Sequence, residues 1–471
     1  MHYDKNFKGF IMAISSLGAG AGILTQDLLD QLREADQAQY INPLDSRIAD
    51  ENKKQDAFKV IDAYMDNVDG SLSTLTEYGV FESRTASSSN EDAATVTAAD
   101  SSDIQDFSLE VINLATKEIV QSAPLAFATK ETTIATGTGQ MELSAGSNTF
   151  TIDYNSSTTL EGLKDLINES AGDSVSATIV QVADGDYRLF LSAKESGLGQ
   201  DIAITDLSGV DAFLNTALTT GVANVQEGID AKFKYNGQII ERSSNVVDDL
   251  LSGVTITLKE AGTTNISVEQ NRENIASKIE NFISKYNSAL YQLGEDTKSS
   301  ENAEERGIFS NESIIKSMKS DMLNMIVRAG EGVGRLQDYG IEVDDDGRLS
   351  LDSAKLNEML DENPDNVQAF FAGGTFTKSD GSEVEVEGAF VEIQGDVSKY
   401  TTYDATLDQY GNLLTSKLES LDEQRTKALE RLTVKYEIMA KQFAAYDLVI
   451  NQLNSVSSMF TDLVNAQSAQ N

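Results

Sequence analysis

The clearest hydrophobic pattern lies near the C-terminal end of the chain, in residues 429–464. Written as heptads, ten of its eleven seam positions are apolar, and Lys, Glu, Gln and Asn largely fill the positions between them. The seam consists of Leu429, Leu432, Tyr436, Met439, Phe443, Tyr446, Ile450, Leu453, Ser457, Phe460 and Val464. This pattern predicts a long helix that packs against other helices.

Two further helices are expected near the N-terminus. Leu24, Leu28, Leu29 and Leu32 mark a short amphipathic helix with a thin seam. Apolar spacings of three and four then predict a long helix over 43–79. We expect Asn42 to be its N-cap, Pro43 to occupy its first position and Gly79 to end it. The apolar positions of this second helix are Phe58, Ile61, Met65, Val68, Leu72 and Leu75.

The pattern changes to strands between residues 80 and 270. Residues 83–103 are rich in Ser, Thr and Ala, which is typical of a linker or of short edge strands. Alternating apolar residues predict strands further on, with hairpins at 175–191 and at Asn236-Gly237. Thr159 is expected to cap a helix between strands. We therefore expect two β-rich domains in this region.

Helical periodicity returns at residue 271 and continues, with two hairpins and an Asn311-capped helix, to the end of the chain. The fold class is therefore α+β multidomain: a helical coiled-coil stalk built from both termini, with a β-rich insertion of two domains. The expected parts are an upstream extension (1–12), an N-terminal tail helix (13–42), a helical stalk domain (43–80 plus 271–435), a β-rich domain (81–120 plus 226–270), an outer β-rich head domain (121–225) and a C-terminal tail helix (436–471).

The terminal helices need partners, because an isolated helix of this kind is only marginally stable. Segments 43–79 and 271–293 can cover about the first half of the seam in 429–464. The last turns of 429–464 and the Leu24–Leu32 segment then have no covering helix within the chain, so we expect them to become ordered on assembly with other subunits. One larger bundle within a single chain is the alternative. The assembly residues are predicted to be Leu24, Leu28, Leu32, Tyr436, Met439, Phe443, Tyr446, Ile450, Leu453, Phe460 and Val464.

Charge narrows the possible partners. The chain has 36 basic and 76 acidic residues, a formal charge of −40, and no concentrated basic stripe. Binding to nucleic acid or to an anionic membrane surface is therefore not expected. No window is apolar enough for a transmembrane helix, and we expect no membrane insertion. Residues 9–24 resemble a signal peptide only superficially, and translation could start at Met1 or Met12.

The residue types available for chemistry are few. The chain has no Cys, and His2 is its only histidine, so zinc, haem, iron–sulfur and Ser-His or Cys-His catalytic sites are not expected. The acidic run ending at Asp346-Gly347 lacks the final Glu of a calcium loop, since Ser353 holds that position, and a tight hairpin turn explains it better. Residues 18–22 lack the rest of a phosphate-binding pattern and are interpreted as a flexible joint. We expect no cofactor, no metal and no catalytic site.

Several stretches also resemble a known family. Residues 13–23 (AISSLGAGAGI), the block 231–290 that contains Asn236-Gly237, residues 339–360 and residues 441–460 are together similar to flagellar hook-associated protein 2, the filament cap protein family. Segment 148–204 looks like the small β domain that recurs in flagellins and cap proteins. The resemblance spans nearly the whole chain from Ala13, while residues 1–12 and the strong acidity depart from it.

This resemblance implies a structural protein at the distal tip of the bacterial flagellum. It implies a ring-shaped homo-oligomer that helps exported flagellin fold, insert and polymerise. Hook–filament junction proteins, and an export chaperone on the C-terminal tail, are the other implied partners. The implied route is the flagellar type III export apparatus, without a cleaved signal peptide, to an extracellular location. A carbohydrate-acting enzyme using two acids, or a surface adhesin with a β-rich head, are the alternatives.

Overall fold

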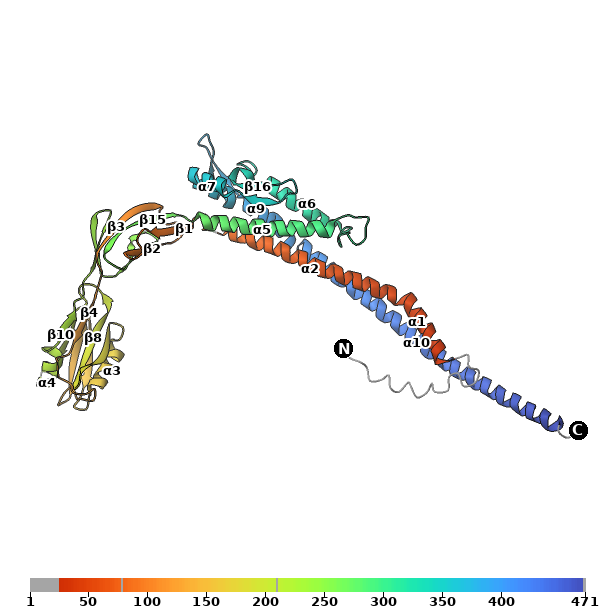
Figure 1. Cartoon of the computed structure of the whole chain (residues 1–471), viewed down its shortest axis with the longest axis horizontal. Coiled ribbons are helices and arrows are strands. Elements are labelled where there is room, and N and C mark those ends of the chain that lie inside the picture. Colours follow the sequence, from red (N-terminus) through yellow and green to blue (C-terminus); the bar gives the residue numbers. More distant parts are fainter. Residues whose placement is uncertain (1–24, 78, 209–210, 469–471) are drawn as a thin grey trace. The chain divides into compact units, whose positions relative to one another are not determined.

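The computed structural model describes residues 25–77, 79–208 and 211–468. Its contacts divide the chain into two compact units. A helical unit combines the segments up to Glu77 and from Ala276 onward, and a β-rich unit comprises Tyr78–Ile275. The predicted order of helices, strands and helices is confirmed (Figure 1).

The helical unit contains long helices with smaller elements between them (Figure 1). Two short hairpins lie between its helices, β16–β17 and β18–β19, as predicted. Its helices and strands are α1 (Gln26–Tyr40), α2 (Asn42–Thr76), α5 (Arg272–Thr297), α6 (Ser313–Arg328), a 3-10 helix η4 (Leu336–Tyr339), β16 (Ile341–Val343), β17 (Leu349–Leu351), α7 (Ser353–Glu362), α8 (Pro364–Ala372), β18 (Gly374–Thr377), β19 (Glu383–Val386), α9 (Ala389–Thr401) and α10 (Thr406–Ser468).

Aromatic side chains fill the centre of the helical unit. Phe390 of α9 stacks on Phe371 of α8 with ring centroids 4.8 Å apart, and its edge meets Phe282 of α5 at 5.5 Å. Tyr286 is fully buried, and its hydroxyl donates to the carbonyl oxygen of Met322 in α6 at 3.3 Å. The apolar residues predicted to line the 43–79 helix, from Phe58 to Leu75, are all buried. The predicted helical seams therefore do form cores.

The helix boundaries differ from those expected at three places. Ile41, not Asn42, is the N-cap of α2, and it makes no side-chain capping bond. Ile41 is buried at 4% exposure directly after α1, so an apolar contact takes the place of a polar cap. At the far end, α2 stops at Thr76 and its C-cap is Glu77, before Gly79. Glu312, not Asn311, is the N-cap of α6.

The inner part of the β-rich unit consists of two antiparallel sheets. Strands run in the order β1-β15-β3-β11-β12 in one sheet and β13-β14-β2 in the other. Their facing sides form one apolar core that includes Phe107, Leu109, Val111 and Phe233. The strands are β1 (Arg84–Ser88), β2 (Ala94–Ala98), β3 (Gln105–Asn113), β11 (Ala231–Tyr235), β12 (Gln238–Arg242), β13 (Val246–Leu251), β14 (Val254–Leu258) and β15 (Gly262–Gln270).

The edge strands and the tight hairpin of this region were both predicted from the sequence. Residues 84–98 form edge strands of the two sheets, so the edge-strand interpretation is confirmed and the linker interpretation is wrong. The Asn236-Gly237 hairpin is also confirmed, with φ of 45° and 84° at its two turn residues. Both residues adopt the left-handed conformation that this short turn requires.

The outer part of the β-rich unit also contains two sheets, with strand orders β10-β4-β8-β7 and β6-β5-β9. Thr159 caps α3 by accepting from the Gly162 amide, as predicted. The predicted β7–β8 hairpin forms around Asp184 and Gly185. The elements are β4 (Lys117–Gln121), β5 (Gly139–Ala145), β6 (Asn148–Tyr154), α3 (Leu160–Ala171), β7 (Val175–Ala183), β8 (Asp186–Ser196), β9 (Ile202–Asp206), α4 (Ala212–Leu214), a π-helical turn η3 (Asn215–Thr219) and β10 (Ala223–Gln226).

Candidate assembly surface

The C-terminal helix α10 is 63 residues long, and its first part packs on α2. The ring of Tyr410 meets that of Phe58 edge-on at a centroid distance of 5.4 Å. Lys417 Nζ lies 2.8 Å from Glu51 Oε2, a carboxylate that is only 6% exposed. Arg425 pairs with Asp45 further along. These contacts fix α10 against α2 from residue 410 to residue 425.

The next segment of α10 packs on α1. Leu29 and Ile41 form one apolar cluster with Leu432, Tyr436 and Ala440. All five are buried at 9% exposure or less. Ala428, Leu429, Met439 and Phe443 lie partly buried at the rim of this cluster. The short N-terminal helix is therefore docked on the C-terminal helix within a single chain.

A polar contact reinforces this docking. Asp36 of α1 accepts hydrogen bonds from Lys435 Nζ at 2.6 Å and from Tyr436 Oη at 2.6 Å. The hydrogen bond from Lys435, and then that from Tyr436, holds the pKa of Asp36 below its usual value. Burial and the neighbouring Asp36 carboxylate raise the pKa of Tyr436 to about 12. At neutral pH the contact therefore joins a carboxylate, an ammonium and a neutral phenol.

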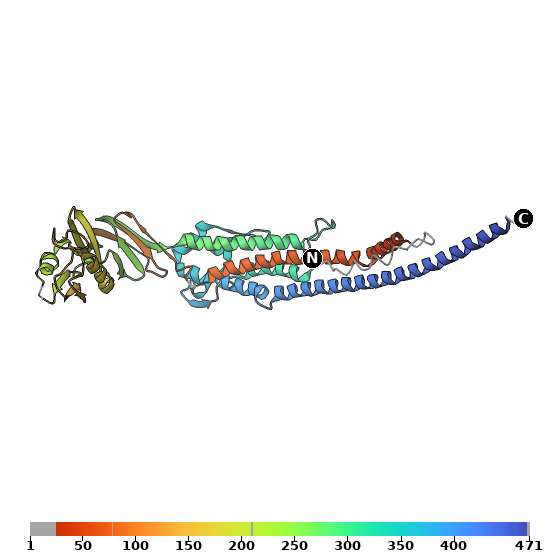
Figure 2. The same cartoon turned by 90° about the horizontal axis from the view of Figure 1, so that it is seen from below.

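Beyond residue 443, α10 continues with most of its apolar side chains open to solvent. Tyr446, Leu453 and Phe460 are 61%, 62% and 66% exposed. In Figure 2 this end of α10 extends past α1. We call residues 444–468 the tail. Its other exposed large apolar side chains are Leu448, Val449, Val456, Met459, Leu463 and Val464.

The exposed apolar residues cover more than one face of the helix. Consecutive residues of an α-helix are turned by about 100°. On that basis Val434 and Ile438, both about half exposed, lie opposite the α1-facing Tyr436. Val449, Val456 and Leu463 continue this second face, whereas Tyr446, Leu453 and Phe460 lie between it and the α1-facing side. A helix that is apolar over so much of its circumference is suited to burial among several neighbours.

Two family models match the chain. One, described as flagellar hook-associated protein 2 N-terminus, matches residues 21–118. The other, described as flagellar hook-associated protein 2 C-terminus, matches residues 228–455. The chain belongs to this family. Together the two models account for more than two thirds of it, including α1, α10 up to residue 455 and the inner two sheets of the β-rich unit.

Relatives in the family match nearly the full length. The A-type flagellar hook-associated protein 2 of Pseudomonas aeruginosa is 28% identical over 93% of this chain and 95% of its own length. Flagellar hook-associated protein 2 of Escherichia coli is 25% identical over 95% of this chain and 97% of its own length. The Helicobacter pylori protein is more similar locally, with 35% identity, but over only 49% of this chain.

A solved structure supports the fold. The D1-D2-D3 domains of the flagellar cap protein FliD from Escherichia coli match with a TM-score of 0.60. The match covers 76% of this chain and 99% of that one, at 21% identity. At this identity the likeness concerns the arrangement of the helices and the β-rich middle, which agrees with the α+β fold class.

The predicted assembly residues fall into three groups. Tyr436 is buried, and Met439, Phe443 and Leu28 are partly buried, around the α1–α10 contact. Tyr446, Leu453, Phe460 and Val464 are exposed on the tail, and Ile450 is partly buried. Leu32 is 38% exposed on α1, and Leu24 lies outside the described residues. No observation tests their role in assembly, which stays a prediction.

Two expectations about coverage are wrong. The 43–79 helix does not cover the seam from residue 429, because α2 contacts α10 earlier, between residues 410 and 425. The Leu24–Leu32 segment is not simply left over either, because Leu29 of α1 is 3% exposed against α10. Helix α5 makes its aromatic contact with α9 and its hydrogen bonds with α6 and β17. The exposed segment is therefore mainly C-terminal.

The predicted assembly residues lack several members of the docked contact. Of these, Leu29, Ile41, Leu432 and Ala440 belong to the apolar core, and Asp36 and Lys435 form the polar anchor. A strict heptad excluded Ala440, although it lies four residues after Tyr436 on the same face. The opposite charges of Asp36 and Lys435 are visible in the sequence. Because the chain has many carboxylates, however, the partner of Lys435 can be identified only once it is known that these two helices pair.

The structure offers little support for the alternative functions. Within residues 25–77, 79–208 and 211–468, no group of three or more His, Asp or Glu residues could hold a metal ion. The predicted turn at Asp346-Gly347 is confirmed: Asp344 Oδ1 accepts from the amides of Asp346 and Arg348, and Gly347 has φ of 81°. None of the helices in the described part of the chain combines the length and apolar content needed to cross a membrane.

Proposed function

We propose that this chain is a structural capping subunit at the distal tip of the bacterial flagellar filament. The proposal rests on family membership and on relatives named flagellar cap protein. In this proposal the subunits form a ring-shaped homo-oligomer through α1 and the tail of α10. The ring promotes the insertion and polymerisation of flagellin that leaves the filament channel.

The exposed tail is the observation that carries the self-assembly part of the proposal. A monomeric protein rarely leaves so many large apolar side chains together in solvent. Burial of each of these side chains would contribute roughly 1.5–3 kcal/mol to the free energy of assembly. The residues concerned are Tyr446, Leu453, Phe460 and Val464. A helix with exposed apolar residues on adjoining faces fits between neighbouring tails better than against one partner.

The proposal also covers the domain boundaries, further partners and the export route. The domain boundaries are those expected from the sequence, including the head at 121–225 and the tail helix from 436. Hook–filament junction proteins and an export chaperone bound to 436–471 are further partners. The protein acts outside the cell after passage through the flagellar type III export apparatus without a cleaved signal peptide. Its role is structural rather than catalytic.

The test replaces Leu453, Phe460 and Val464 together by Ser in the full chain. These side chains are exposed, so the isolated subunit should stay folded. We expect loss of the oligomer by native mass measurement, and in a strain carrying only this variant we expect reduced swimming and unpolymerised flagellin in the medium. The matched control replaces the exposed polar residues Gln452, Ser455 and Ser458 by Ala.

The two outcomes separate the parts of the proposal. An oligomer that persists with the triple-Ser variant would contradict assembly through the tail. A lost oligomer with normal swimming and normal flagellin polymerisation would contradict the capping function, even though the tail does assemble.

A further inference from the structure

Strand β7 of the outer β-rich part is an open sheet edge. It is the last strand in the order β10-β4-β8-β7 and pairs with β8 on one side only. The direction of each backbone group follows from the pairing. Lys194 N donates to Ser174 O, so residues 174, 176, 178 and 180 point their backbone groups toward β8. Ala177, Ile179 and Gln181 therefore point theirs outward.

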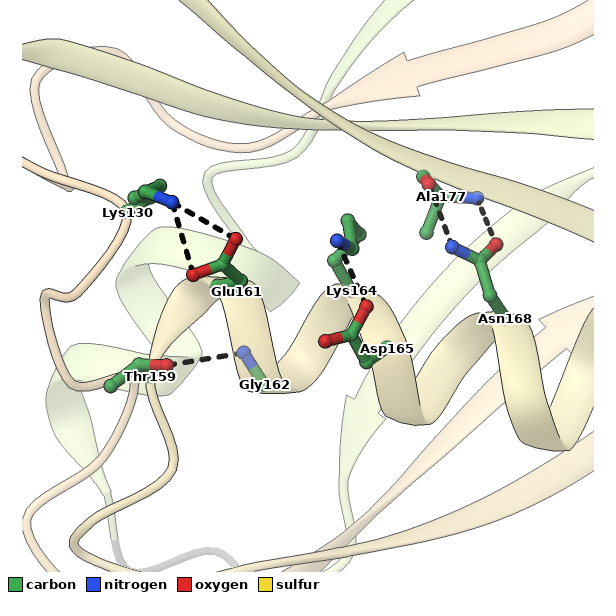
Figure 3. A network of polar contacts seen from close by, with 8 residues as sticks. All are labelled: Lys130, Thr159, Glu161, Gly162, Lys164, Asp165, Asn168 and Ala177. Carbon is green, nitrogen blue, oxygen red and sulfur yellow. Dashed lines mark hydrogen bonds and ion pairs between the residues drawn. The ribbon is translucent and has the colours of Figure 1, made fainter.

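The outward backbone groups of Ala177 are already hydrogen-bonded by a side chain. Asn168 of α3 donates from Nδ2 to the carbonyl oxygen of Ala177 at 2.9 Å and accepts at Oδ1 from the Ala177 amide at 2.9 Å (Figure 3). The carboxamide thereby imitates one residue of a neighbouring strand. The end of α3 near Thr159 is held separately, by the Thr159–Gly162 cap and the Lys130–Glu161 pair (Figure 3).

The edge beyond Ala177 remains free among the described residues. Ile179 and Gln181 each keep an outward N–H and C=O that no described residue binds. Val180 and Val182 are both 43% exposed on the solvent face of the same strand. An edge of this kind is a template for another extended strand, because only a strand offers matching donors and acceptors in register.

Charge indicates which strand fits. Residues 174–183 contain no charged side chain, in a chain with a formal charge of −40. Contact between two copies of this protein is opposed by repulsion over most of the surface, and least so where neither copy carries charge. Sheet edges usually carry Lys, Pro or bulges that prevent such pairing. Between Ala177 and Ala183, β7 has no Lys or Pro, and its one irregularity against β8 lies at the end of this segment, between Gln181 and Ala183.

We propose that β7 pairs antiparallel with β7 of a second copy of this chain, about a two-fold axis at Val180. This register sets Ile179 opposite Gln181 of the partner and uses the two free residues of each edge, giving four hydrogen bonds. A register centred on Ile179 would require Ala177 to bond Gln181 of the partner, although Asn168 already occupies the backbone groups of Ala177. The register centred on Val180 places Ala177 opposite Ala183, the last residue of the partner's β7, and needs no bond there. Asn168 therefore selects the register, and the outcome is one sheet continuous across two heads.

The contact is small compared with a standard interface of about 1,200–2,000 Å². It therefore joins heads that are already close. Because neighbours in one ring are related by rotation about the ring axis and not by a two-fold axis, the paired heads belong to two rings that face each other. The pairing does not depend on the tail of α10, so its test stands apart from the test of the capping function.

The experiment uses the absence of native Cys. Opposed residues of a non-hydrogen-bonded antiparallel pair have Cα atoms about 4.5 Å apart, within the range for a disulfide. Val180→Cys in the full chain should therefore form a covalent dimer under mild oxidation, through Val180 of both copies. The matched control is Thr178→Cys, an exposed residue on the same face of the same strand, which lies opposite Val182 of the partner and not opposite itself. We expect at least tenfold faster dimer formation for Val180→Cys.

A second change tests the hydrogen bonds. Gln181→Pro removes an outward N–H without touching the bonds to β8, and proline is tolerated on a free edge. In the Val180→Cys background it should slow dimer formation at least tenfold, with an unchanged circular dichroism spectrum. Equal rates for Val180→Cys and Thr178→Cys would overturn the register. A Val180→Cys chain that a maleimide labels but oxidation leaves monomeric would overturn self-pairing.

Discussion

The two parts of α10 have a similar sequence pattern but different surroundings. Up to residue 443 the helix is buried on one side by α2 and then by α1, and ion pairs from Lys417, Arg425 and Lys435 reach across to those helices. In the tail, apolar residues of the same kinds remain exposed. Apolar content alone therefore does not show where a helix is covered. What differs is the length of the N-terminal partner, since the described α1 begins at Gln26.

Two tyrosines ten residues apart distinguish the covered part of α10 from the tail. Tyr436→Ala should destabilise the dilute subunit by about 3 kcal/mol, because it empties a core position between α1 and α10. Tyr446→Ala should change the stability of the dilute subunit by less than about 0.5 kcal/mol, because Tyr446 is 61% exposed. Urea unfolding followed by circular dichroism measures both. Similar losses for the two variants would mean that the tail is covered in the single chain.

A second prediction concerns how α2 holds α10. Lys417→Ala removes the partner of the buried Glu51 carboxylate and should destabilise the helical unit by about 2 kcal/mol, less than for a fully buried pair because Lys417 is half exposed. Lys427→Ala breaks only the exposed pair with Glu423 on the same helix, so it should leave the urea midpoint almost unchanged. Urea midpoints of the two variants give the comparison. Equal shifts would show that burial of Glu51 is unimportant.

The tail offers a change in the stabilising direction. Ser457 is the one polar residue in the eleven-position seam, and Ser457→Leu should strengthen assembly by about 1 kcal/mol per subunit. Native mass measurements on serial dilution should then show the oligomer persisting to roughly fivefold lower concentration. Ser458→Leu, one residue on and turned by about 100°, is the control. Stronger assembly with Ser458→Leu alone would mean that the other face of the tail carries the contact.

The smallest expected effect is the pH dependence of α1 docking. The depressed pKa of Asp36 adds stability that is present above the unfolded pKa of about 4 and is lost as pH falls. The raised pKa of Tyr436 has the opposite sign, so its contribution is lost between about pH 10 and pH 12. Spin labels at Glu34→Cys and Thr433→Cys should report α1 closest to α10 between these limits. Asp36→Asn should abolish the acid limb and weaken the alkaline one, because the Asp36 carboxylate is one of the causes of the raised pKa of Tyr436.

Much of the fold was predictable because local signals and tertiary structure agree. The Asn236-Gly237 turn, the Thr159 cap and the alternation at Phe107, Leu109 and Val111 each depend on a few neighbouring residues. The failures come from packing. The Ile41 boundary was missed because an apolar residue in a core replaces a polar cap there.

The sequence predicts an apolar surface on α10, but it does not predict which residues of α10 contact which helix. Periodicity identifies the apolar face of α10, yet it does not say which helix meets which turn. The assignment of α1 to Leu432 and Tyr436, and of α2 to Tyr410 and Lys417, depends on how far each helix extends and where the chain bends between α1 and α2. The second face at Val434 and Ile438 was missed because a 3.5-residue repeat follows only one stripe at a time.

The continuity of α10 has a mechanical consequence. The helix runs without a break from Thr406 to Ser468, a rod of roughly 95 Å at about 1.5 Å per residue. Torque or tension applied near Phe460 is therefore transmitted along one stiff shaft to the ring of Tyr410, with no intervening joint to absorb it. The nearest joint lies on the other side, in the short turn before Thr406 where Asp404 has φ of 60°. A load on the far end of this shaft would thus be relieved at that turn, beside α9.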